Sequence, residues 1–377
     1  MIEGIAFALF ICLILVAISK KFTLPPIPLY IIAGILIGTS GLGIVEQSEV
    51  SDFLTQLGLL FLLFTMGLEL KPDEVAAKGT SFLASGAIDF CINGLIGFAA
   101  ALLLGFPLYD AIVMMSAFYI SSSAMAFSSL IENRRLIFKE SETVIWLMVF
   151  EDLVLVLIMI VLSTSERRPI VDIALIILMV GGIFGIAYLL RDYIKALLSR
   201  SDEMPFVFTF ILVLAAAGVA EFLSVPDTIA VIALGSALSM IEPRSFERAA
   251  KPYRDVFLIV FFVFFGISVN FTGGFSLILL LGLGLLAILS KLVSGLCIGR
   301  VFHGSWSSGM EIFSHSASRG EFSIALAGMF GSPVIASTVA SMVVITSLIG
   351  GFLGKYSGRL RKVFRKKVRD KDGSGII

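Results

Sequence analysis

Apolar runs about twenty residues long dominate this sequence, and they constrain its fold more than any other feature. A transmembrane helix needs about 20 predominantly apolar residues, and thirteen stretches are candidates. They cover approximately residues 2–19, 27–45, 53–69, 80–104, 107–130, 142–163, 170–190, 205–224, 227–241, 255–270, 274–301, 308–330 and 333–353. Charged residues make up only 15% of the chain, against about 25% in soluble domains. The sequence therefore predicts an all-α polytopic membrane protein with about 13 transmembrane helices.

Basic residues are distributed unevenly among the predicted loops. If the N-terminus lies outside, all but four of the 28 basic residues fall in inner loops or in the tail, residues 355–377. The four exceptions are Arg167 and Arg168 in an outer loop, and Lys291 and Arg319 within apolar runs. Because cytoplasmic loops are enriched in Lys and Arg, we predict an outer N-terminus and a cytoplasmic C-terminus. The basic tail is expected to lie at anionic lipid headgroups.

The chain also resembles itself at an offset of about 200 residues. Phe64–Leu70 resembles Val263–Val269, and Ile31–Leu36 resembles Ile232–Ala237. The offset corresponds to seven predicted spans, and an odd number of spans inverts the second copy. Inverted repeats are common in secondary transporters, which bind their substrate near the bilayer midplane between the repeats.

This offset divides the chain into predicted parts. The first six-helix repeat covers about 1–163, and the second covers about 204–354. A linker helix at about 170–200 joins them, so that residues 1–354 form one transmembrane domain. The basic tail follows this domain.

Two adjacent acids, Glu151 and Asp152, lie inside the sixth apolar run. A carboxylate in hydrocarbon is costly, so such residues are rare and usually face a cavity or a partner. Neighbours on a helix point about 100° apart, which favours different roles for the two acids. A pair held only by basic side chains is the alternative. A functional ion site is the interpretation we favour.

Hydroxyl clusters interrupt two of the spans. Ser121–Ser129 contains five serines, and Ser314–Ser323 occupies the corresponding place in the second repeat. Hydroxyls can satisfy freed backbone groups and thereby permit a break inside a spanning helix, although small polar residues also serve ordinary helix packing. The matching positions favour two broken helices that cross at the midplane, near Glu151 and Asp152.

Four further charged residues lie at membrane depth. Lys291 is too deep to reach the surface easily, so it should either lose its proton or have an acid as partner. Arg319 and Glu321 lie midway along their span, where they neutralise each other or neighbouring groups, or take part in transport. Asp89 stands alone in the fourth span, and a packing role is as compatible with the sequence as a transport role.

Other functional classes find no support in the sequence. Net charge is zero, so nothing indicates a nucleic-acid partner. Neither the three cysteines nor the isolated His303 and His315 form a metal-binding pattern. A phosphate-binding glycine loop and hydrolase motifs are absent from the sequence. We therefore expect a transporter without cofactors and not an enzyme.

Four motifs together resemble one family, the monovalent cation:proton antiporters of the Kef/NapA-like branch. They are Leu24–Gly38, Leu57–Leu70, Phe150–Leu153 and Arg319–Phe322. The similarity covers essentially the whole chain. It implies a NapA/NhaA-like antiporter fold and a homodimer, each protomer having a dimerisation domain and a mobile core.

The resemblance also implies residue roles. It implies that Asp152 binds the ion and the proton, and that Lys291 pairs with Glu151. The chain departs from relatives that have Asp-Asp or Gln-Asp at the acidic pair, which leaves stoichiometry and ion preference open. Kef proteins also carry a cytosolic nucleotide-binding regulatory domain, and because this sequence ends shortly after its last predicted span, we expect no regulation of that kind within it.

These observations predict an antiporter that exchanges Na+ or K+ for H+. Asp152 can hold a proton or a dehydrated cation but not both well, and this competition couples the two fluxes. Hydroxyls of Ser121, Ser122 and Ser123, with freed carbonyls, are expected to complete the oxygen shell of a hard cation. A K+-selective efflux antiporter, a channel-like Kef-type cation transporter and an organic-anion symporter are the alternatives.

Overall fold

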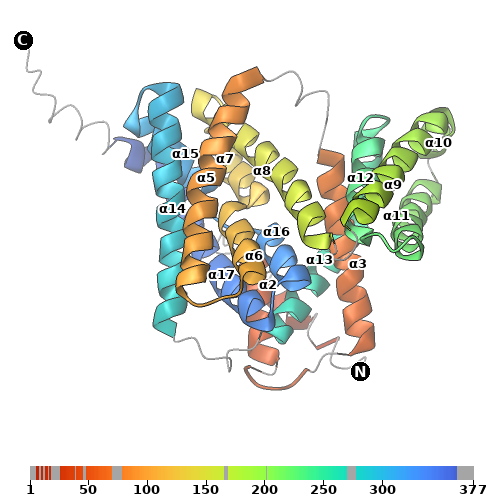
Figure 1. The fold of residues 1–377 in the computed structure, drawn as a ribbon, viewed down its shortest axis with the longest axis horizontal. Helices are drawn as coiled ribbons and strands as arrows, with labels where there is room; N and C mark the ends of the chain where they lie inside the picture. Colours follow the sequence, from red (N-terminus) through yellow and green to blue (C-terminus); the bar gives the residue numbers. More distant parts are fainter. Residues whose placement is uncertain are drawn as a thin grey trace, which may run out of the picture. The chain divides into compact units, whose positions relative to one another are not determined.

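The residues that the computed structural model describes are mainly helical, and no β-strand is found among them (Figure 1). These residues are 6–7, 10–11, 13–15, 17, 26–38, 40–45, 48–69, 79–164, 169–200, 202–269 and 277–362. The helices are α2 (Pro26–Ile37), α3 (Glu49–Glu69), α5 (Gly79–Leu103), α6 (Leu108–Tyr119), α7 (Ser123–Glu132), α8 (Lys139–Ser163), α9 (Pro169–Leu189), α10 (Arg191–Leu198), α11 (Met204–Phe222), α12 (Asp227–Ser239), α13 (Pro243–Ser268), α14 (Leu277–His303), α15 (Trp306–Ser316), α16 (Glu321–Phe330) and α17 (Pro333–Lys355). Most of the predicted first span, 2–19, lies outside the described residues.

Seven of the helices in the described residues are long and apolar enough to cross a membrane. They are α3, α5, α8, α9, α11, α14 and α17. Four shorter apolar helices, α2, α6, α12 and α16, accompany them. The all-helical, membrane-type architecture agrees with the prediction. The count of thirteen spans stays a prediction.

Several boundaries differ from the predicted spans, each for a local reason. The second span was expected to reach residue 45, but α2 ends at Ile37. The chain turns at residues 40–42, beside Gly41 and Gly43, and Gly43 has φ +64°. The tenth span was expected to begin near residue 255, but its helix begins at Pro243. The first three turns were missed because they are amphipathic and polar. Hydropathy alone does not detect such a polar extension.

The chain divides into two compact units. Unit 1 consists of Met1–Leu9, Gln47–Lys78 and Asp152–Phe265. Unit 2 consists of Phe10–Glu46, Gly79–Glu151 and Gly266–Ile377. Two helices belong partly to each unit, because the boundaries fall within α8, after Glu151, and within α13, after Phe265.

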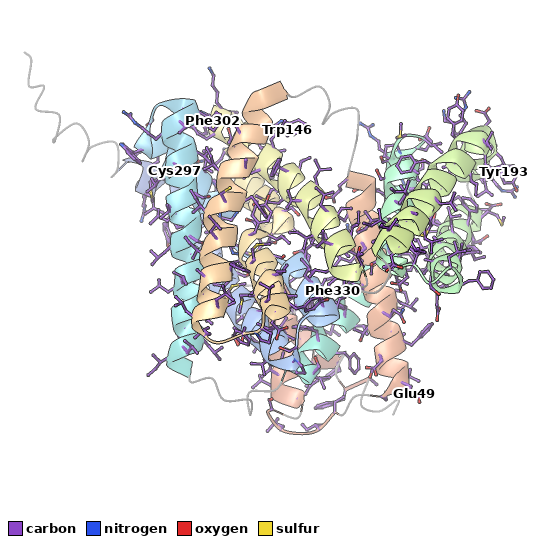
Figure 2. All side chains as sticks on the ribbon, in the orientation of Figure 1. Glu49, Trp146, Tyr193, Cys297, Phe302 and Phe330 are labelled. Atoms are coloured by element: carbon purple, nitrogen blue, oxygen red, sulfur yellow. The ribbon has the colours of Figure 1, made fainter. Side chains whose placement is uncertain are left out.

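Unit 1 is built around α12. Every residue of this short helix from Thr228 to Ser239 is buried, because α3, α9 and α11 all pack against it. Beside it, the ring of Phe61 lies 5.6 Å from that of Phe210 and 6.0 Å from that of Phe257. In contrast, α9 and α10 expose large apolar side chains, and Tyr193 projects outward from α10 (Figure 2). Such a surface suits lipid or a protein partner rather than water.

Unit 2 contains the interrupted helices. The long helices α5, α14 and α17 pack against the short helices α6, α7, α15 and α16. One of its apolar clusters is formed by Ala126, Leu130, Val144, Leu147, Met148, Ile298 and Ile312. The same unit holds the polar network of the candidate site.

Four glycines pack helices closely in a reciprocal manner. In unit 1, a Cβ on Gly235 would lie 2.3 Å from the carbonyl oxygen of Phe64 and 2.9 Å from the Cα of Gly67. In unit 2, a Cβ on Gly266 would lie 2.9 Å from the Cα of Gly34. These glycines are the matched positions of the predicted repeats. A two-fold relation between the repeats would produce such a pair of contacts, and the inverted repeat itself stays a prediction.

Candidate functional site

Two helix interruptions meet in unit 2. The first lies between α6, which ends at Tyr119, and α7, which begins at Ser123. The second lies between α15, which ends at Ser316, and α16, which begins at Glu321. Ser121 and Arg319 form an isolated antiparallel β-bridge, and the Ser122 N–H donates to the Ser318 carbonyl at 2.9 Å. The two interruptions therefore satisfy part of each other's backbone.

Hydroxyl groups bind further backbone groups freed at the interruptions. The Ser323 hydroxyl donates to the carbonyl of Ile120 at 3.2 Å, and that of Ser347 donates to the carbonyl of Arg319 at 2.8 Å. The Ser122 side chain accepts from the Met125 N–H and caps α7. This is how a helix can be broken in an apolar environment without leaving polar groups unpaired. Both interruptions occur where the serine clusters predicted them.

Gly320 sets the distance between the interruptions. A Cβ at this position would lie 2.7 Å from the Cα and 2.8 Å from the Cβ of Ser122. Contacts below 3.0 Å cannot be accommodated without movement of one backbone, so only glycine fits here. The close approach places Arg319 and Glu321, on either side of Gly320, beside the first interruption.

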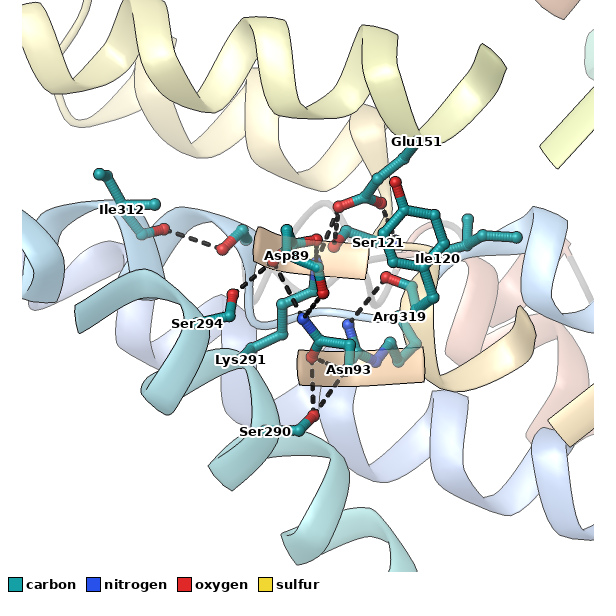
Figure 3. A network of polar contacts seen from close by, with 12 residues as sticks. Asp89, Asn93, Ile120, Ser121, Glu151, Ser290, Lys291, Ser294, Ile312 and Arg319 are labelled. Carbon is teal, nitrogen blue, oxygen red and sulfur yellow. Dashed lines mark hydrogen bonds and ion pairs between the residues drawn. The ribbon is translucent and has the colours of Figure 1, made fainter. Parts of the chain in front are cut away.

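Lys291 on α14 lies between two carboxylates (Figure 3). Its Nζ is 2.6 Å from Asp89 Oδ2 on α5 and 2.8 Å from Glu151 Oε1 on α8. All three side chains are no more than 2% exposed. Glu151 also accepts from the Ser121 hydroxyl at 3.0 Å and from the Ser121 N–H. The expected Lys291–Glu151 pair is therefore present, and Asp89 joins it.

Arg319 extends the network to the second interruption (Figure 3). Its Nη2 donates to Asn93 Oδ1 at 3.1 Å, to the Ser290 hydroxyl at 3.1 Å and to the Ala287 carbonyl at 3.0 Å. The amide of Asn93 donates in turn to Asp89 Oδ1 at 3.0 Å. Side chains of α5 and α14 thus connect both interruptions through hydrogen bonds.

The structure places the other predicted residues as follows. Asp152 is buried and follows Glu151 on α8. The Ser122 hydroxyl lies 3.3 Å from Glu321 Oε2, which brings these two predicted residues together. Ser123 is 9% exposed and begins α7. Arg319 and Lys291 are fully buried.

Sequence reasoning missed part of this site. It left the role of Asp89 open, and it did not identify Asn93, Ser290 or Ser294. One signal was available, because Asp89 and Asn93 are four residues apart, as are Ser290 and Ser294, and such pairs share a helix face. The spacing could not show that these two faces meet.

A second buried polar network joins the C-terminal end of α7 and the loop after it to the C-terminal half of α15. Arg135 binds Glu311 through two hydrogen bonds of 2.7 and 2.8 Å. His315 Nε2 lies 3.4 Å from the same carboxylate, and its Nδ1 lies 2.8 Å from the Ser129 hydroxyl. His315, which showed no metal pattern in the sequence, therefore belongs to an ion-pair network.

The first residues of the predicted tail pack against unit 2. Residues 357–362 are helical. Arg361 Nη2 lies 2.8 Å from Glu140 Oε1, which also accepts from the Ser308 hydroxyl at 2.7 Å. This part of the tail is thus joined to the rest of unit 2 by a partly buried ion pair.

Comparison with known proteins identifies a single family. The model of the family described as "Sodium/hydrogen exchanger, transmembrane" matches residues 6–356 of the chain. This match contains both interruptions and every member of the lysine network.

Individual relatives agree with this match. The chain is 28% identical to a protein from Bacillus subtilis named "K(+)/H(+) antiporter subunit KhtU", over 97% of the chain and 96% of the relative. It is 26% identical to the "Na(+)/H(+)-K(+) antiporter GerN" of Bacillus cereus, over 90% and 92%. The solved structure of the sodium proton antiporter MjNhaP1 from Methanocaldococcus jannaschii is similar, with a TM-score of 0.67 and 19% identity over 96% of the chain and 98% of that structure. That last similarity concerns the fold alone.

Proposed function

Because this chain belongs to the sodium/hydrogen exchanger family of transmembrane proteins, we propose that it is a secondary antiporter. It exchanges Na+ or K+ for H+ across the membrane by alternating access, with Asp152 as the carboxylate that binds either the cation or the proton. The family match confirms the resemblance found in the sequence. The relatives are named as transporters rather than enzymes, and cation:proton exchange is the activity that they share.

One observation supports this function most strongly. Glu151 is fixed by Lys291 and by the backbone of the first interruption, and the next residue of α8 is the buried Asp152. Glu151 thus has a structural role beside the first interruption, and Asp152, at the next position of α8, is the acid to which the family resemblance assigns ion and proton binding. Neighbours on a helix point about 100° apart, which suits different roles for the two acids.

Competition for Asp152 couples the two fluxes. A protonated carboxyl is neutral and cannot balance a dehydrated cation, whereas the ionised form can bind one. Hydroxyls of Ser121, Ser122 and Ser123, with carbonyls freed at the interruption, complete the oxygen shell that hard cations prefer. Exchange results if the site changes its exposure only when it is occupied by a proton or by a cation.

The preferred cation is left open by the site, because Na+ and K+ both bind oxygen ligands. The relatives include one named for K+/H+ exchange and one named for Na+/H+ and K+ exchange. A K+-selective antiporter therefore remains the second candidate, and the same assay tests both cations.

The wider setting follows from the same proposal. The protein is an integral membrane protein, and we place it in a prokaryotic inner membrane with the N-terminus outside and the C-terminus in the cytoplasm. It acts in pH homeostasis as a homodimer. The exposed apolar side chains of α9 provide surface for lipid or for a second protomer. From its composition, the basic tail is proposed to interact with anionic lipid headgroups.

The experiment uses the purified full-length chain in liposomes that contain a pH-sensitive dye. A pH gradient is imposed, and Na+, K+ or choline is added outside. We expect Na+ or K+, but not choline, to dissipate the gradient. Asp152→Asn should abolish this response because an amide can neither release a proton nor balance a cation. Asp192→Asn, at a carboxylate that is 85% exposed, is the matched control and should behave as the unmodified protein does.

Near-normal exchange by Asp152→Asn would remove Asp152 from the mechanism while leaving the family assignment intact. Movement of the cation that is not coupled to movement of protons would indicate a channel. A response to an organic anion alone would indicate a symporter.

A further inference from the structure

Asp89 is the one acid of the buried network that the proposed mechanism does not use. It lies on α5 and is 1% exposed. Three donors converge on its carboxylate: Lys291 Nζ at 2.6 Å, the Asn93 amide at 3.0 Å and the Ser294 hydroxyl. An ionised carboxylate only accepts hydrogen bonds, and all three of these groups donate to it.

The contacts of Lys291 are those of an ammonium group. Its distances of 2.6 and 2.8 Å to two carboxylates are in the range of charge-assisted hydrogen bonds or shorter. The third direction is occupied by the Tyr119 ring, whose centroid lies 5.7 Å from Nζ, within cation–π distance. If Lys291 lost its proton, two buried carboxylates would share one neutral amine.

The four charges of this network balance. Asp89 and Glu151 contribute two negative charges, and Lys291 and Arg319 contribute two positive charges (Figure 3). The exchange of one proton for one monovalent cation at Asp152 leaves this balance unchanged. Release of a proton from Lys291 would instead leave the network with a net negative charge inside the membrane, which is costly.

The two acids that hold Lys291 differ in what else binds them. Glu151 accepts hydrogen bonds from Ser121 in the first interruption and is adjacent in sequence to Asp152. A cation that binds at Asp152 therefore acts directly on Glu151. The donors to Asp89 described above all belong to α5 and α14. Asp89 therefore holds Lys291 from α5 and is linked to the second interruption indirectly, through Asn93, which accepts a hydrogen bond from Arg319.

We propose that Asp89 is a positioning residue that keeps Lys291 as an ammonium ion through the whole transport cycle, which makes the exchange electroneutral. One cation moves in one direction, one proton moves in the other, and Asp152 binds both in turn. The inference rests on the proposed antiport function. Without Asp89, a cation arriving at the site would displace the Lys291 proton, and each cycle would move a second proton and one net charge.

The experiment measures proton flux and charge movement on the same liposomes. A dye inside reports pH after addition of Na+ or K+, and transient currents are recorded from the liposomes adsorbed to a solid-supported membrane. For the unmodified protein we expect a cation-driven pH change and no current above that of protein-free liposomes. For Asp89→Asn we expect a pH change accompanied by a current in the direction of proton movement. Asp89→Asn combined with Lys291→Met should lose that current again, and Asp89→Glu should resemble the unmodified protein.

Each contrary result is distinct. A cation-driven current from the unmodified protein overturns the inference but leaves the antiport function standing, and this measurement decides the matter even if no variant folds. A folded Asp89→Asn protein that exchanges ions without a current, or that does not exchange them at all, also overturns it. Absence of any cation-driven pH change from the unmodified protein refutes the antiport function itself.

Discussion

Replacement of Lys291 by Met should destabilise the protein markedly, since it removes the only ammonium that touches both Asp89 and Glu151 in the described structure. Removing one partner from a buried ion pair costs about 3–5 kcal/mol, because a charge is left without compensation. Here two carboxylates lose their partner, and each is no more than 2% exposed. The loss should therefore reach at least the upper part of that range.

This free energy can be expressed as a melting temperature. Unfolding entropies of about 2.1 cal/mol/K per residue give about 0.8 kcal/mol/K for 377 residues. A loss of about 4–5 kcal/mol then lowers the melting temperature by roughly 5–6 °C. Removing the unpaired charges should restore part of it in two steps. Adding Glu151→Gln to Lys291→Met removes one stranded carboxylate, and further adding Asp89→Asn removes the second.

The assay is thermal unfolding of the detergent-purified protein, followed by tryptophan fluorescence. Lys195→Met, which removes an exposed lysine from α10, is the matched control and should change the melting temperature by less than about 1 °C. The reasoning is refuted if the three substitutions lower stability additively, since additivity would mean that the groups do not interact. The role of Asp89 in particular is refuted if Glu151→Gln, added to Lys291→Met, restores the melting temperature as fully as the triple substitution does.

Two further predictions concern packing and the tail. Gly320→Ala should lower stability by about 1–3 kcal/mol because its Cβ would overlap Ser122. The control, Gly181→Ala, places a Cβ in open space on α9 and should be neutral or stabilising in the same unfolding assay. Equal effects of the two substitutions would contradict the close approach of the interruptions. Truncation after Gly354 should leave exchange intact. It should lower stability by about 1 kcal/mol relative to truncation after Lys362, because only the longer chain keeps the Arg361–Glu140 pair. Indistinguishable melting temperatures of the two truncated proteins would show that this pair contributes nothing to stability.

Much of the architecture was predictable because the bilayer imposes simple rules. Apolar length located α3, α5, α8, α9, α11, α14 and α17, and these helices agree with predicted spans. The serine clusters located both interruptions, since hydroxyls are the groups that can satisfy freed backbone inside a membrane. For Lys291, physical reasoning allowed either loss of the proton or an acidic partner, and the family resemblance pointed to Glu151.

The remaining features depend on which helices are neighbours. Asp89 and Asn93 lie on one face of α5 by spacing alone, but nothing in the spacing shows that this face meets Lys291 and Ser294 on α14. The pairing of Arg135 with Glu311 was missed for a related reason: each belongs to a different segment, and both resemble ordinary residues near helix ends. Hydropathy also could not detect the polar first turns of α13, which are helical despite their charge.

The central claim is that a cation and a proton compete for one carboxylate, and the pH dependence of the apparent KM for the cation tests it most directly. Proton release on cation binding makes affinity pH-dependent. In initial-rate measurements with liposomes, the KM for Na+ or K+ should fall as the pH rises, by up to about tenfold per pH unit in the range where protons occupy the site. The maximal rate at saturating cation should change much less. A KM that stays constant across that range, while the rate itself varies with pH, would contradict competition at a single site.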